Sequence, residues 1–569
     1  MPRPFVSVRR AAIGACTGCT LAASACASGG ATPAAQASAP AHGARELPAE
    51  QQAWQALSRA AFGPRPGEVA RVQAIGVDRW IDAQLHPARV DDAAWERLAP
   101  LFPVEVADVA RLAQQYPPQN VWLQRLRHAR GVPDTAQLVL TAQDSADWKA
   151  LDQQANRLAG EFGPVRVARA LVTERQLQEV MTDFWENHFS VFAGKMPTRF
   201  TAVAYDRDVI RPRALGRFRD LLGAVAHSPA MLWYLDGYQS RVSPDRMSLP
   251  EWRADSAAGA AHRPPPRRNR RGAGLNENYG RELLELHTLG VDGGYTQQDV
   301  IGVARALTGW TLADATQGGG FVFRPELHDA EAKTVLGHQL PAGRGVEDGE
   351  EVLDIVARHP STARFIARKL CVRFVGDTPP DALVARAAAT FRASDGDIAA
   401  TLGTILHSRE FFSRQAFRAK VKTPFELVVS GFRALNATPD TTGRSAGQVA
   451  RLGEPFFGHL TPEGWPETGE PWLASGSLLD RVNFGVQLGG GRFPGASLDR
   501  WSPGWTLAFE RPAQQVDGVV RLLLGADVAP ATRATLLGPA VGPDSARAAP
   551  LPLGPLVGLA LGTPEFQRR

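Results

Sequence analysis

The chain has 569 residues, of which 44% are hydrophobic and 21% are charged, as in an ordinary globular protein. Beyond the N-terminus, no run approaches the eighteen or so apolar residues of a membrane-spanning helix, so we expect a soluble body. The formal net charge is +5, and residues 1–25 contribute Arg3, Arg9, Arg10 and no acid, so the rest carries only +2. This near-neutral balance excludes a general electrostatic attraction to nucleic acid.

The first 25 residues have the features of an export signal. Arg9 and Arg10 give a positive start, and residues 11–25 form a run of small, moderately apolar residues. The sequence from Ala23 to Cys26 then resembles a lipobox, which predicts acylation of Cys26 as a lipid anchor. Simple cleavage after residue 25 is the alternative. Both alternatives export the protein, and the lipobox predicts a periplasmic or outer-membrane lipoprotein that contacts the membrane only through its anchor.

Residues 26–48 are rich in Ala, Ser, Gly and Pro, a composition that is typical of a flexible tether. From residue 49 to residue 569, helical patterns punctuated by Pro and Gly dominate, and alternating strand-like runs are scarce. We therefore predict an all-α fold: one large domain, a multi-helix orthogonal bundle with long loops and at most a small β-hairpin near residues 320–323. Cys371 is the one cysteine of this body, which excludes an internal disulfide there.

Residues 239–274 differ from the rest of the body because they are polar and hold an arginine- and proline-rich run at 263–271. Such a run cannot bury apolar surface, so we expect a disordered basic insertion. Contact with a polyanion, such as an acidic polysaccharide or lipid headgroups, is the functional alternative.

Residues 182–190 are the first motif that could carry chemistry. On a helix, apolar side chains would fill one half of the circumference, and His188 would lie in the middle of that half. The other half would hold Thr182, Asp183, Glu186, Asn187 and Ser190. A buried imidazole needs a hydrogen-bond partner or a metal, because burying it unsatisfied costs about 1–3 kcal/mol.

Residues 276–290 repeat this arrangement. A helix there would place His287 on its apolar face and Gly280 where another element packs closely. Its polar face would hold Arg281, Glu282 and Glu285, of which Arg281 and Glu285 have the i,i+4 spacing of an ion pair.

Residues 290–299 resemble the second half of a calcium loop, with Asp292 and Asp299 as the acidic ligands. Thr288 and Gly290 stand where the first half would need carboxylates. A glycine turn followed by a capping box from Thr296 to Asp299 explains the same residues, so calcium is the less favoured ion.

Three histidines and a carboxylate could together bind a divalent transition metal. The candidate ligands are His188, His287 and His328. The candidate catalytic residues are His188, Glu282, Glu285, His328 and Asp329. The alternative is that each histidine is a separate core residue with its own hydrogen bond. The sequence contains no nucleophile elbow, phosphate loop or dinucleotide fingerprint.

Taken in order, the motifs of the body resemble the bacterial domain-of-unknown-function family 1800. The matching stretches are residues 57–67, 184–189, 276–290, 294–296, 306–310, 328–329, 359–363 and 464–466. The resemblance implies a large helical exported protein and supplies no activity. It also implies that a second, co-exported protein is a plausible partner.

Two function hypotheses follow. The first is a cell-envelope binding or accessory protein that contacts a co-exported protein or a cell-surface polymer, with no nucleic-acid partner. The second is a metal-assisted periplasmic enzyme, hydrolase-like, with a site of histidines and carboxylates.

Overall fold

The computed structural model describes residues 44–569, except 134, 198, 260–273, 314–318, 502, 504–506, 508–509, 526–527 and 539–548. Helices dominate this part of the chain, which confirms the all-α prediction. The predicted signal peptide, Cys26, most of the tether and the arginine run at 263–271 lie outside the described residues. None of the described helices is both long and apolar enough to span a bilayer.

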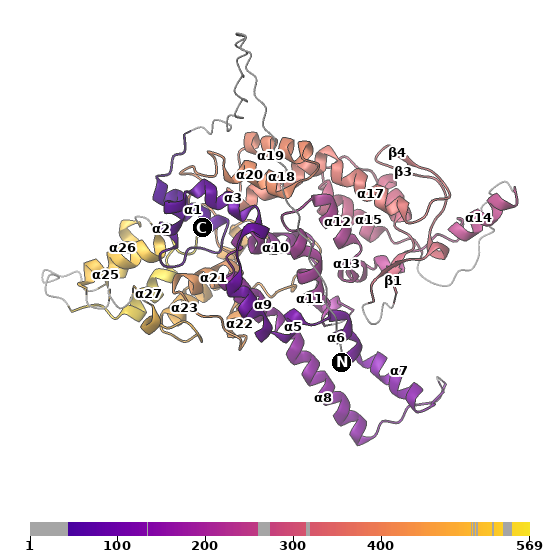
Figure 1. Cartoon of the computed structure of the whole chain (residues 1–569), viewed down its shortest axis with the longest axis horizontal. Helices are drawn as coiled ribbons and strands as arrows, with labels where there is room; N and C mark the ends of the chain where they lie inside the picture. Colours follow the sequence, from indigo (N-terminus) through magenta and orange to yellow (C-terminus); the bar gives the residue numbers. More distant parts are fainter. Residues whose placement is uncertain are drawn as a thin grey trace, which may run out of the picture. The chain divides into compact units, whose positions relative to one another are not determined.

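The first part of the chain is a succession of helices (Figure 1), which contribute to a large apolar core and to a smaller one around Trp95, Phe102 and Leu112. In order they are α1 (Ala49–Arg59), α2 (Glu68–Ile75), α3 (Val77–Gln84), α4 (Ala93–Leu98), α5 (Pro103–Val106), α6 (Val109–Gln115), α7 (Gln119–Ala129), α8 (Ala142–Ala159), α9 (Phe162–Val172), α10 (Gln176–His188), α11 (Thr201–Ala204), α12 (Phe218–Ala226) and α13 (Pro229–Tyr234).

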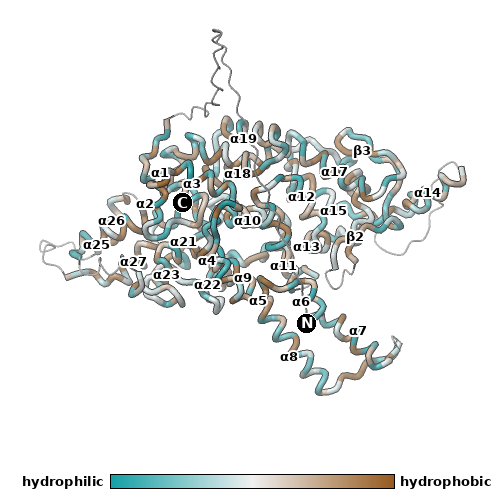
Figure 2. The backbone as a smooth tube through the Cα atoms, viewed as in Figure 1, coloured by the Kyte–Doolittle hydropathy of each residue, from teal (hydrophilic) through white to brown (hydrophobic). Residues whose placement is uncertain are grey.

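The second part continues with α14 (Leu249–Ala257), α15 (Glu277–Glu282), α16 (Gln297–Ala306), α17 (Glu347–Arg358), α18 (Pro360–Phe374), α19 (Asp381–Ala393), α20 (Ile398–Leu406), α21 (Pro424–Ala434), α22 (Arg444–Arg451), α23 (Ser475–Gly489), α25 (Pro512–Val519), α26 (Pro530–Leu537) and α27 (Leu553–Gly562). Apolar and polar residues alternate along most of these helices (Figure 2), as expected when each buries one face.

The strands of the described residues form two short antiparallel hairpins. Strand β1 (Trp310–Leu312) pairs antiparallel with β2 (Phe321–Phe323), and Trp310 lies opposite Phe323. This is the predicted hairpin. A second one joins β3 (Lys333–Val335) to β4 (His338–Leu340). The β3–β4 hairpin was not predicted, because strands of three residues are too short to show an alternating pattern.

The predicted disordered insertion at 239–274 is partly ordered, which corrects that expectation. Helix α14 lies inside it and begins with a capping box in which Ser248 and Glu251 bond each other's backbone. Ser248 also forms a β-bridge with Asp329. Local capping, this bridge and the burial of Val242, Met247 and Leu249 hold the segment in place.

The helix predicted over residues 276–290 changes its pitch halfway. It is α-helical as α15, and residues 283–288, which include His287, continue it as a π-helix. Gly280 does permit close packing, because a Cβ there would lie 3.0 Å from the Val300 carbonyl oxygen of α16. The capping box predicted at Thr296 and Asp299 opens α16.

Helices α23 and α27 lie side by side (Figure 1) and approach through glycines. A Cβ on Gly489 of α23 would lie 2.4 Å from the Gly558 nitrogen and 2.6 Å from the Gly554 oxygen of α27. Both contacts are with backbone atoms, so side-chain rotation cannot relieve them.

We therefore expect Gly489→Ala to lower the free energy of unfolding by about 1–3 kcal/mol, because the two helix backbones must move apart. Urea denaturation measures the change. Gly476→Ala in the same helix is the matched control, since nothing lies within 4 Å of its Cβ position. The control should be neutral or stabilising by up to about 1 kcal/mol. Equal effects of the two substitutions would contradict close glycine packing.

Candidate functional site

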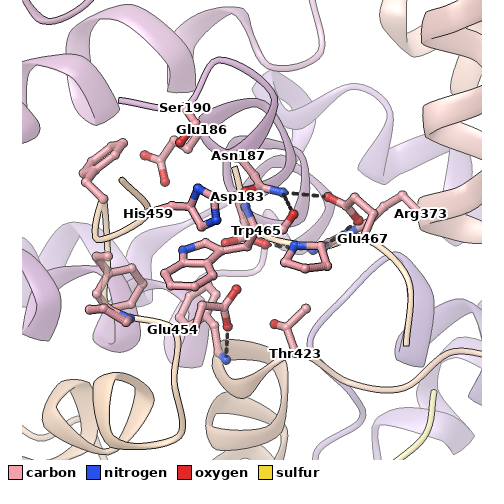
Figure 3. A pocket seen from close by; sticks show the side chains of 15 residues that line it. Asp183, Glu186, Asn187, Ser190, Arg373, Thr423, Glu454, His459, Trp465 and Glu467 are labelled. Atoms are coloured by element: carbon pink, nitrogen blue, oxygen red, sulfur yellow. Dashed lines mark hydrogen bonds and ion pairs between the residues drawn. The ribbon is translucent and has the colours of Figure 1, made fainter. Parts of the chain in front are cut away.

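A small pocket opens between α10 and the segment that follows α22 (Figure 3). Its volume is about 40 Å³, enough for a few water molecules or one small chemical group. Four parts of the chain line it: α10, α18, the start of α21 and residues 454–467. The lining residues are Asp183, Glu186, Asn187, Ser190, Arg373, Thr423, Phe425, Glu454, Pro455, Phe456, Phe457, His459, Trp465, Pro466 and Glu467.

The polar half of the motif at 182–190 faces this pocket. Helical periodicity correctly predicts this polar half, whereas His188, the predicted candidate site residue, lies on the opposite half and does not line the pocket. The signal that could have found the pocket was the number of polar side chains on one helix face. A solvent-exposed face would show the same pattern, so the sequence alone does not separate the two cases.

Asn187 fixes the pocket wall by binding the chain at residues 464–467. Its Nδ2 donates to the Trp465 carbonyl oxygen at 2.8 Å, and its Oδ1 accepts from the Trp465 backbone N–H at 2.6 Å. Nδ2 also lies 3.2 Å from Oε1 of Glu467. Gly464 is required beside this clamp, because its φ is +76° and a Cβ would lie 2.4 Å from the Asn187 carbonyl oxygen.

Two buried arginines hold the carboxylates at the base of the pocket. Arg373 of α18 lies 2.8 Å from Asp183 and 3.0 Å from Glu426, and it reaches Glu467 at 3.5 Å. Arg166 of α9 lies 2.9 Å from Glu186. Both guanidinium groups are almost fully buried, so these ion pairs act in a low-dielectric environment.

Further charged side chains surround these ion pairs. Arg166 also reaches Asp206 at 2.8 Å, and Arg211 lies 2.6 Å from the same carboxylate. Arg569 lies 2.8 Å from Glu426. Although burial opposes it, the pairing with these arginines lowers the pKa of both Asp206 and Glu426, so both stay ionised.

Two other carboxyl groups have the opposite shift. Burial and then the nearby Asp183 charge raise the pKa of Glu454 to about 8. Burial and the neighbouring Asp206 raise the pKa of Glu186 well above its usual range, although Arg166 opposes this. The raised pKa favours the protonated form of both groups, and with a pKa of about 8 Glu454 carries a proton at neutral pH that it can donate.

His459 supplies a base on the same pocket. Its Nδ1 lies 3.0 Å from the Thr461 carbonyl oxygen, so this nitrogen carries the proton and donates, which leaves Nε2 as an acceptor. The ring packs edge-on against Trp465, with 4.7 Å between centroids. A protonated carboxyl group and an imidazole on one pocket can serve as general acid and general base.

The predicted histidines His188 and His287 do meet, but not as metal ligands. Their ring centroids are 6.3 Å apart. The His188 ring donates from Nε2 to the His287 carbonyl oxygen at 3.0 Å, and its Nδ1 lies 3.0 Å from Nζ of Lys369. Both nitrogens of His188 are therefore engaged with the protein. Those of His287 have no hydrogen-bond partner and are fully buried.

His328 belongs to a different buried network, together with Asp329. Its Nδ1 donates to the Thr308 carbonyl oxygen at 2.8 Å, and its Nε2 lies 3.4 Å from Asp348. Asp329 pairs with Arg305 at 2.7 Å. No three His, Cys, Asp or Glu side chains of the described residues are grouped so that they could hold a metal. The structure therefore brings His188 and His287 near each other but places His328 in a separate network.

The remaining candidate residues are carboxylates that are partly or fully exposed or that cap a helix. Glu282 and Glu285 are half-buried, and Glu285 accepts from the Tyr295 hydroxyl at 3.2 Å. Asp299 accepts from the Thr296 and Leu336 backbone N–H groups, as a helix cap does. Asp292 is exposed. The half calcium loop is thus a turn followed by a cap.

The fold and the pocket define a large all-α protein with a buried, ion-paired acidic site. The chain belongs to the family described as protein of unknown function DUF1800, whose model matches residues 55–568. No curated protein and no solved structure matches the chain.

The buried histidines predict a specific loss of stability in acid. Burial, and next the Lys369 charge, lower the pKa of His287 to about 3, while in the unfolded chain it is about 6.5. The unfolded state therefore takes up a proton first. The stabilisation is complete above pH 6.5 and is lost as the pH falls towards 3. Going from pH 7 to pH 5 should cost about 2 kcal/mol for this residue.

Urea unfolding at several pH values tests this. His287→Leu should reduce the slope of unfolding free energy against pH by about 1.4 kcal/mol per unit between pH 6 and pH 4. The exposed His128→Leu is the control and should leave the slope unchanged. An unchanged slope in His287→Leu would mean that His287 is protonated while folded.

Proposed function

We propose that the chain is an exported, lipid-anchored protein of the cell envelope that binds a small polar ligand in the pocket beside α10. The N-terminal signal and Cys26 support the location. A co-exported protein or a cell-surface polymer is the proposed partner of the body.

The main support for a ligand site in this pocket is the pair of hydrogen bonds between Asn187 and Trp465. These bonds, at 2.8 and 2.6 Å, fix a pocket wall that comes from a segment far along the chain. A wall held in place before a ligand arrives reduces the entropy lost on binding. The buried carboxyl groups and His459 give this wall its polar chemistry.

The location has a direct test. In a bacterial host, the wild-type protein should incorporate labelled fatty acid and sediment with membranes. Cys26→Ser should abolish the label and release the protein into the soluble periplasmic fraction. Cys19→Ser, within the signal itself, is the matched control and should keep the label. Membrane association without label would contradict lipid anchoring.

A second candidate function is hydrolase-like acid–base chemistry, favoured by Glu454 as a proton donor and His459 as an acceptor on one pocket. A protonated acid and a neutral base near pH 7 are the two groups that such a reaction needs. The metal-assisted version of this hypothesis has less support, since the histidines proposed as ligands do not share a site.

Hydrolysis of a panel of model esters and amides tests this candidate. Glu454→Gln and His459→Asn should each lower the rate by at least about 100-fold, and the wild-type rate should fall above pH 8 as Glu454 ionises. Glu463→Gln, an exposed acid of the same segment, is the control. A rate that a chelator abolishes and a transition metal restores would instead support the metal-assisted alternative.

A further inference from the structure

We propose that the pocket beside α10 binds a small cationic group, an ammonium head, between the carboxyl groups of Glu186 and Glu454. The inference rests on the proposed function, because it assumes that this pocket is the ligand site. The inference specifies that the proposed small polar ligand is positively charged and has the size of an ammonium group.

The charge of the lining is the first argument. The lining residues include the carboxyl groups of Asp183, Glu186, Glu454 and Glu467 but a single guanidinium, that of Arg373. That guanidinium is already paired with Asp183 at 2.8 Å and with Glu426 at 3.0 Å. The wall therefore offers a ligand more carboxyl groups than cationic groups.

An unsatisfied oxygen inside the pocket is the second, independent argument. Oε1 of Glu186 is buried and receives no hydrogen bond, while Oε2 is paired with Arg166 at 2.9 Å. The Glu186 side chain is only 9% exposed. Glu186 and His459 both line the pocket (Figure 3). An N–H donor from a ligand would satisfy this oxygen, and a charged donor would do so most strongly.

The shifted acids indicate where the positive charge would go. Glu186 faces Arg166 from α9 and Asp206 and Arg211 from the segment after α11, and its burial raises its pKa, which favours the protonated form. A cation placed beside it would favour the ionised form, so the carboxylic O–H bond would break and the proton would pass to solvent. Net binding then exchanges one proton for one cation.

Glu454 has the same property from the other side of the pocket. It faces Asp183 from α10, Glu426 from α21 and Arg481 from α23, and its pKa of about 8 lies close enough to neutrality for a ligand to displace the proton. The exchange should therefore be measurable between pH 6 and pH 8.

Aromatic rings and volume restrict the ligand further. Phe457 and Trp465 line the pocket, and ring faces attract cations. Phe425 and Phe456 already face the Arg166 guanidinium, at 5.4 and 5.7 Å from its carbon. A volume of about 40 Å³ leaves room for a small group such as methylammonium.

Calorimetry of the purified full-length protein with methylammonium chloride tests the proposal, with acetate and acetamide as probes of negative and zero charge. We expect binding of methylammonium alone, with proton release detected in buffers of different ionisation enthalpy. Glu186→Gln and Glu454→Gln should each weaken binding by at least about tenfold. Glu463→Gln is the control variant, and circular dichroism confirms that each variant is folded.

Three results would overturn the cation assignment. Equal heats with sodium chloride would show an ionic-strength effect, and unchanged binding in both pocket variants would place the cation elsewhere. Binding of acetate or acetamide that Glu186→Gln or Glu454→Gln weakens would refute the cationic ligand while keeping the pocket as the ligand site, so the two proposals fail separately.

Discussion

The pairing of buried guanidinium groups with buried carboxylates is the interaction on which the centre of this protein depends. Arg166 and Arg373 come from α9 and α18, and each neutralises carboxylates from other elements. Removing one partner of such a pair leaves an uncompensated charge in a low-dielectric interior, at a cost of about 3–5 kcal/mol. Helices far apart in sequence are therefore held in one relative position by charge as well as by apolar packing.

This network also explains why the pocket has its chemistry. Asp206 and Glu426 have arginine partners and stay ionised, whereas burial raises the pKa of Glu186 despite its Arg166 partner and raises that of Glu454 to about 8. The same residue type thus has two protonation states within one cluster. Such a division of carboxyl groups is frequent at functional sites, because it provides a proton donor near neutral pH.

The buried histidines are a different use of polar groups in the core. His188 joins α10 to the π-helical segment 283–288 through the His287 carbonyl oxygen, and His328 joins the two hairpins to α17 through Thr308 and Asp348. Helical periodicity correctly predicted that His188 and His287 are buried. It could not predict their partners, because those partners lie about a hundred or more residues away in the chain or on another element.

The sequence by itself determined the local features of this protein. Apolar periodicity and capping residues were sufficient for the all-α fold and for the helix start at Thr296, because these depend on neighbours within a few residues. Only the tertiary structure decided which polar helix face lines a pocket and which carboxyl groups keep a proton. Those properties depend on distances between α9, α10, α18 and residues 454–467, and on the low dielectric that their packing creates.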